Sequence, residues 1–96
     1  MKILLFIVLL MSSIYASQDV YDAKNITQIN NKLYNKNSKK LINGTINTHF
    51  KSGKLQESIP CINGIPNGTA TEYNEQGTII TKRVYKDGIV ISITHF

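Results

Sequence analysis

The apolar residues of this chain follow two patterns, one continuous and one interrupted. Residues 3–11 form an unbroken apolar run after Met1 and Lys2. From residue 45 onward, short stretches rich in Thr, Ile, Val and Tyr alternate with turns that contain glycine. A basic start followed by a short apolar run is typical of a secretory signal. Short β-prone stretches between glycine turns are typical of antiparallel strands.

The glycine turns divide the second part of the chain into strands. Asn63-Gly64 and Asp87-Gly88 are signals for two-residue type I′ hairpin turns, in which both central residues need a positive φ. Residues 51–53 and 75–77 suit three-residue turns with the glycine in the left-handed region. These turns predict strands at 45–50, 54–62, 69–74, 78–86 and 89–96.

The six glycines of the chain form three pairs, and the same interval separates the members of each pair. The pairs are Gly44 with Gly68, Gly53 with Gly77, and Gly64 with Gly88. A fixed period of this kind, here about 24 residues, indicates an internal repeat. The expected fold is therefore all-β, an antiparallel β-hairpin meander built from two equivalent units.

A further hairpin is expected upstream of the repeats. Residues 26–29 and 32–36 flank Asn30-Asn31, and asparagine tolerates the left-handed region that a tight turn needs. A short helix over Ile26, Ile29 and Leu33 is the alternative. The expected division is a signal peptide over 1–16, a mobile lead-in or first hairpin strand over 17–32, and a β-repeat domain over 33–96.

The N-terminal run predicts export. It is 9 residues long, whereas a membrane-spanning helix needs about 20. We therefore predict a signal-peptide helix that is cleaved near Ala16 and leaves a periplasmic or secreted protein. A buried N-terminal strand of a cytosolic protein is the alternative interpretation.

The net charge of the chain bears on which partners are expected. The chain carries 11 Lys and Arg residues against 6 Asp and Glu residues, a formal net charge of +5. Lys36, Lys39 and Lys40 concentrate this excess before the first repeat. A positive excess suits an anionic envelope surface or an acidic partner, although lysines that are simply solvated give the same pattern. Export takes the chain away from nucleic acid, so no nucleic-acid partner is expected.

The reactive side chains are few. One cysteine and two histidines exclude a disulfide framework and a multi-cysteine zinc site. Cys61 is either a half-buried strand residue or one half of an intermolecular disulfide, and His49 with His95 lacks a third metal ligand. We expect no catalytic residue, no metal and no cofactor, so the prediction is that the chain is not an enzyme. The acidic side chains considered as acid–base pairs, and expected instead to be solvated, are Glu57, Glu72, Glu75 and Asp87.

Two features suggest binding. The aromatic side chains Tyr34, Phe50, Tyr73 and Tyr85 form either a contact surface or a ladder that stiffens the sheet. The last strand contains Ile91 and Ile93 within a run that has no charged side chain other than His95. An exposed strand edge without charged side chains tends to pair with another strand. We expect this strand either to be covered by the N-terminal part of the chain or to pair with a partner, such as a second copy.

Residues 33–90 contain a set of turn and aromatic positions, namely Asn43-Gly44-Thr45, Phe50, Gly53-Lys54-Leu55, Asn63-Gly64, Asn67-Gly68-Thr69, Tyr73, Gly77, Tyr85 and Asp87-Gly88. This set resembles the MORN-repeat variant family (YwqK-family antitoxin-like proteins). Cys61 stands where the second unit has Tyr85, and Asn74 stands where the first unit has Phe50. The resemblance implies hairpin repeats and, in some members, an antitoxin role.

The expected function is that of an exported, non-enzymatic protein-binding or scaffold module of the periplasm or envelope. One alternative, implied by the resemblance, is an antitoxin or immunity-like protein that neutralises a toxin partner. The other is weak binding to anionic envelope lipid through the lysine cluster.

Overall fold

Residues 19–96 are described by a computed structural model, and the predicted signal peptide at 1–16 lies outside these residues. The described part is mostly β, with one 3-10 turn and no α-helix. In chain order the elements are β1 (Asp19–Asp22), η1 (Ala23–Asn25), β2 (Ile26–Ile29), β3 (Lys32–Asn35), β4 (Gly44–His49), β5 (Leu55–Ile62), β6 (Ile65–Pro66), β7 (Gly68–Tyr73), β8 (Ile79–Lys86) and β9 (Ile89–His95).

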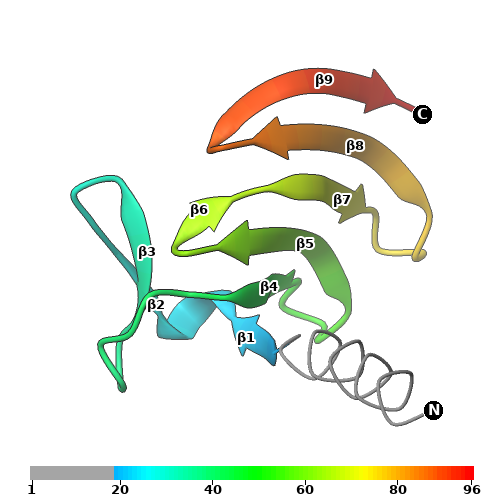
Figure 1. The fold of residues 1–96 in the computed structure, drawn as a ribbon. Helices are drawn as coiled ribbons and strands as arrows, with labels where there is room; N and C mark the ends of the chain where they lie inside the picture. Colours follow the sequence, from blue (N-terminus) through cyan, green and yellow to red (C-terminus); the bar gives the residue numbers. More distant parts are fainter. Residues whose placement is uncertain (1–18) are drawn as a thin grey trace, which may run out of the picture.

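Seven strands form one mixed sheet, in which β1-β4-β5-β7-β8-β9 follow one another and β6 also pairs with β5 (Figure 1). All neighbours from β4 to β9 are antiparallel, but β1 lies parallel to β4, with Val20 opposite Thr45. The expected meander was therefore wrong at this edge. The chain passes through η1 and the β2–β3 hairpin before it reaches β4, and a connection of this length allows a parallel pair.

The internal repeat appears in the pairing of the strands. Gly44 lies opposite Cys61 in the first unit, and Gly68 lies opposite Tyr85 in the second. Each ladder then has a β-bulge at the same place, at Thr48/His49 and at Glu72/Tyr73. The closing hydrogen bonds also repeat, since Phe50 donates to the Lys54 carbonyl at 2.8 Å and Asn74 to the Thr78 carbonyl at 2.9 Å.

The turns have the conformations that their residues predict. Asn63 and Asp87 have φ values of 51° and 52°, and each is followed by a glycine with positive φ. Gly53 and Gly77, at the ends of the three-residue turns, have φ values of 95° and 83°. All six glycines have positive φ, so the equivalent glycines of the two units occupy equivalent bends.

The upstream hairpin has formed and the alternative helix has not. β2 and β3 pair with Ile29 opposite Lys32, and Asn30 and Asn31 both have positive φ. The hairpin stands beside the main sheet (Figure 1) and is fastened to it by main-chain hydrogen bonds. Leu33 donates to the Gly64 carbonyl at 2.8 Å, and Ile42 donates to the Leu33 carbonyl at 3.1 Å. Residues 19–22, which belong to the expected mobile lead-in or first hairpin strand, form β1 and pair with β4 rather than with the hairpin.

The core is small and lies under the first unit. Ile42, Ile46 and Cys61 are buried together. Their partly buried neighbours come from β1, η1, the hairpin and β5, and are Tyr21, Ala23, Ile26, Leu33 and Ile59. In the second unit Ala70 replaces Ile46 and is 1% exposed. Because little apolar surface is buried there, β8 and β9 are held mainly by their ladders.

Candidate functional site

The outer side of β9 is the most exposed strand surface in the described part of the chain. Every residue of β9 is exposed, and the large apolar side chains among them include Ile89 at 67%, Ile91 at 60% and Ile93 at 52%. Phe96, which follows the strand, is 70% exposed. Figure 1 shows β9 at the margin of the sheet, with β8 on one side. We call the side of β9 that faces away from β8, over residues 89–95, the β9 edge.

The hydrogen bond of Phe96 shows which main-chain groups the β9 edge presents. Phe96 lies beyond the last ladder pair and donates to the Ile80 carbonyl at 3.0 Å. In an antiparallel pair, alternate residues direct both their N–H and C=O groups to the same neighbour. Thr94 therefore faces β8, while Ile93 and His95 direct N–H and C=O away from the sheet. Ile91 is the extra residue at a bulge, because Ser92 lies opposite Val84 and Val90 opposite Tyr85.

The β9 edge lacks the side chains that usually protect an exposed strand, and its one protective feature is the bulge at Ile91. Such strands commonly carry lysine, proline or an inward-pointing charge. β9 contains no Lys, Arg, Asp, Glu or Pro. Within residues 19–96, the N-terminal part of the chain lies at the opposite edge, where β1 pairs with β4. The expectation that the N-terminal part covers the last strand is therefore not met by these residues.

The four predicted aromatic contact residues do not share one surface. Tyr73 lies opposite Ile79 at one end of the β7–β8 ladder, and Tyr85 lies opposite Gly68 at the other end. Tyr34 is on β3 in the hairpin, bridged to Leu41, and Phe50 follows β4. All four are partly buried rather than exposed. Of the predicted contact residues, only Ile91 and Ile93 are strongly exposed.

Tyr34 instead lies with two of the predicted lysines. An open cleft of about 480 Å³ beside the hairpin is lined by Thr27, Ile29, Tyr34, Asn35, Lys36 and Lys39. The Lys36 ammonium group donates to the Lys24 carbonyl at 3.1 Å, which holds it beside the hairpin. Lys39 has a positive φ of 64°, and the chain reverses its direction in the turn that contains this residue, after β3. Lys40 is exposed but does not line the cleft.

Two of the acidic side chains form a charge cluster that sequence analysis did not predict. Glu57 lies opposite Glu72 across β5 and β7. Arg83 of β8 lies 3.5 Å from a Glu57 carboxylate oxygen and 3.6 Å from one of Glu72. Burial raises the pKa of Glu57; the Arg83 charge lowers it in part, and the Glu72 charge adds to the rise. The expectation that these two carboxylates are simply solvated was wrong, because the register places them next to one cation.

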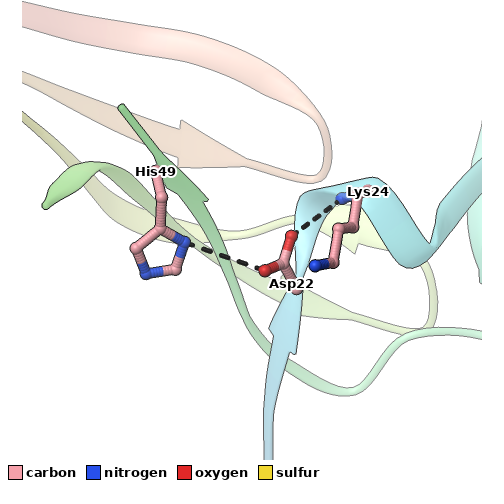
Figure 2. A network of polar contacts seen from close by, with 3 residues as sticks. All are labelled: Asp22, Lys24 and His49. Atoms are coloured by element: carbon pink, nitrogen blue, oxygen red, sulfur yellow. Dashed lines mark hydrogen bonds and ion pairs between the residues drawn. The ribbon is translucent and has the colours of Figure 1, made fainter. Parts of the chain in front are cut away.

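Asp22 connects β1 to the strand beside it (Figure 2). Its carboxylate accepts a hydrogen bond from the Lys24 N–H at 3.0 Å, which caps η1. Its other oxygen lies 3.8 Å from His49 Nδ1, a contact between partly exposed groups. His95 is on β9, and β5, β7 and β8 separate it from β4, so the two histidines do not meet. Within the described residues no group of three His, Cys, Asp or Glu side chains is placed to hold a metal ion.

Cys61 is a core residue in the described structure. Its side chain is 3% exposed and packs with Ile42 and Ile46. Burial raises the pKa of the thiol to about 11, so it is protonated at neutral pH. A buried, protonated thiol is poorly reactive, and this agrees with the strand-residue interpretation rather than with the intermolecular disulfide.

The comparisons with known proteins found no matching family model, no matching curated protein and no matching solved structure. No helix among residues 19–96 has the length and apolar character needed to cross a membrane.

Proposed function

We propose that this chain is an exported, non-enzymatic β-repeat protein that binds a protein partner by adding a strand to the β9 edge. The observation that carries this proposal is a seven-residue edge strand that is exposed throughout and has no Lys, Arg, Asp or Glu. Main-chain groups of Ile93 and His95 would bond the added strand, and the apolar side chains of β9 would pack against its neighbours. Strand addition is an established mode of protein recognition and needs no catalytic group.

We also propose that the two units are repeats of the MORN-repeat variant family. The support is the resemblance in sequence, together with the repetition of turns, bulges and register at one constant interval along the chain. For the antitoxin-like members, the implied partner is a protein toxin. Export from the cytoplasm would then place that partner in the envelope or outside the cell.

Ile93→Lys tests the proposed function. A lysine on an edge strand opposes strand addition, so the tagged variant should lose a partner that the wild-type chain captures from its native cells. Ile62→Lys is the matched control, because Ile62 is 54% exposed on β5, away from the β9 edge. A partner that is retained by Ile93→Lys, or lost equally from both variants, would contradict the proposal.

The hairpin cleft supports a second candidate function, weak binding to an anionic membrane surface. Lys36 and Lys39 line the same cleft as Tyr34 and Ile29. Lysines near an anionic surface contribute about 1 kcal/mol each, and tyrosine is suited to the boundary between apolar and polar surroundings.

Charge reversal distinguishes this candidate from the first. Lys36→Glu with Lys39→Glu should weaken binding to phosphatidylglycerol vesicles at least about tenfold. The control pair, Lys51→Glu with Lys86→Glu, makes the same change in net charge at exposed positions outside the cleft. Vesicle co-sedimentation at low and high salt provides the measurement, because screening weakens a surface attraction. Equal losses in both double variants would show that only net charge matters.

A further inference from the structure

We infer that the strand that adds to the β9 edge is β9 of a second copy of this chain, antiparallel to the first and centred on Ile93. This inference rests on the proposed function and names its partner. Three features of the described residues support it, namely the repeat position of Ile93, the register that the edge permits, and the contrast between the two edges of the sheet.

Comparison of the two repeat units shows that β9 has no neighbouring strand on its outer side, where β7 has β8. Thr71 lies opposite Ser58, and Thr94 lies opposite Lys82, the residue that corresponds to Ser58 in the second unit. Ile93 therefore takes the position that Ala70 takes one unit earlier. Ala70 is 1% exposed and has β8 beside it, whereas Ile93 is 52% exposed. A strand added to the β9 edge would cover Ile93 on the side where β8 covers Ala70.

The outward main-chain groups of Ile93 permit a symmetric pair. A residue that directs both its N–H and C=O outward can exchange two hydrogen bonds with the same residue of a second strand around a two-fold axis. With Ile93 at this axis, the side chain of Ile93 lies opposite its copy and Ser92 lies opposite Thr94 of the second copy. Ile91 then lies opposite His95. No pair joins two charged side chains, because β9 contains no Lys, Arg, Asp or Glu and His95 lies opposite Ile91, so two molecules with the same net positive charge meet without a like-charge pair along the strand.

The other edge of the sheet is a poorer match for β9. β1 has four residues, two of which are Asp19 and Asp22, whereas β9 has seven and carries no acidic or basic residue other than His95. Pairing β9 with β1 would also be head-to-tail and would generate an open array, while β9 with β9 closes as a dimer. Length, charge and closure therefore all favour the symmetric pair.

Sedimentation equilibrium of the purified chain, in the form that accumulates in its cells, tests the inference over a wide range of concentration. We expect a monomer–dimer equilibrium that Ile93→Lys weakens at least about a hundredfold, because two lysines would face each other at the axis. Ile62→Lys adds the same charge at an equally exposed strand position, 54% against 52%, and should dimerise as the wild type does. Circular dichroism of both variants checks that the sheet has formed.

Disulfide trapping tests the register. Ile93→Cys should form a covalent dimer on mild oxidation, because Cα atoms in a hydrogen-bonded antiparallel pair are about 5.5 Å apart, within disulfide range. Thr94→Cys should not, because its nearest copy lies diagonally across the strands at about 7–8 Å. Cys61 is buried and does not compete. Trapping at residue 94 instead of 93 would overturn the register.

A chain that stays monomeric at all concentrations would overturn the inference, as would a dimer that Ile93→Lys leaves intact. The failure of the inference can be separated from that of the proposed function. A monomer that captures a different protein, and loses it through Ile93→Lys, would overturn the second copy as partner while supporting strand addition at the β9 edge.

Discussion

Gly64→Ala is expected to lower the free energy of unfolding by about 3 kcal/mol, the largest effect of any single glycine substitution in the hairpin turns. Gly64 has a φ of 76°, which disfavours a side chain, and a Cβ there would lie 2.8 Å from the Leu33 carbonyl oxygen. It would also lie 2.7 Å from Leu41 Cδ2. Because Leu33 belongs to β3, the added methyl group would force the β2–β3 hairpin away from the main sheet.

Gly77→Ala and Gly88→Ala provide the matched controls, with the same substitution at positive φ. A Cβ at Gly77 meets nothing within 4 Å, so only the backbone conformation opposes it, at about 1–2 kcal/mol. A Cβ at Gly88 meets only Ile65 Cγ2 at 3.0 Å, and that side chain can move. Urea denaturation of the three variants should therefore give increasing losses in the order Gly77, Gly88, Gly64. Equal losses at Gly64 and Gly77 would show that the hairpin does not pack as described.

This order shows which parts of the fold are predictable from the sequence. Asn63-Gly64 and Asp87-Gly88 are predictable because the residues of a type I′ turn must themselves adopt positive φ. The strands between them follow, since the turns bound them and their β-prone residues fill them. What Gly64 contacts across space is not predictable in the same way, because Leu33 and Leu41 are brought there by a hairpin whose docking has no local signal.

β1 and the Arg83 cluster illustrate the same limit. Residues 19–22 are a short stretch with Asp at both ends, and their strand exists because the edge of β4 accepts them in a parallel register. Glu57 and Glu72 belong to different strands, and their approach depends on the change of partner along β5 from β6 to β7. Once the turns are known, the register of β7 and β8 can be predicted from the sequence. In that register Glu72 lies opposite Thr81 and therefore diagonal to Arg83. The pairing of β5 with β7 cannot be predicted in this way.

The β9 edge was partly predictable for a related reason. An uncharged run over residues 89–94 is visible in the sequence, and so is its place after the last glycine turn. The outward direction of the Ile93 main chain is not, because the bulge at Ile91 shifts the alternation by one residue. The contact residues proposed from the sequence therefore included Ile91 and Ile93, together with four aromatic residues that the structure distributes elsewhere.

Arg83→Met is expected to lower the free energy of unfolding by about 1–2 kcal/mol at neutral pH and by much less under acid conditions. The substitution leaves the Glu57 and Glu72 carboxylates facing each other without a cation, in a setting where burial already raises the pKa of Glu57. The three side chains are 27–31% exposed, and water reduces the effect below that of a fully buried charge.

The sign of the pH dependence follows from the raised pKa of Glu57. Where a carboxyl group binds its proton more tightly in the folded state than in the unfolded state, stability falls as the pH rises from the unfolded pKa through the folded one. Without Arg83 this raised pKa should rise further, so the variant should lose stability as the pH increases above about 4.5. Well below that value Glu57 is protonated in both the folded and the unfolded state, the repulsion between two carboxylates is lost, and the variant should approach the wild type.

Urea denaturation between about pH 3.5 and pH 7 measures this difference. Lys82→Met is the matched control, because it removes a positive charge from the neighbouring residue of β8 without touching either glutamate. Adding Glu57→Gln to Arg83→Met should restore most of the lost stability at neutral pH, since one carboxylate then has no like charge opposite it. If Arg83→Met were equally destabilising at both ends of the pH range, its effect would come from lost packing of the arginine stem and not from the two carboxylates.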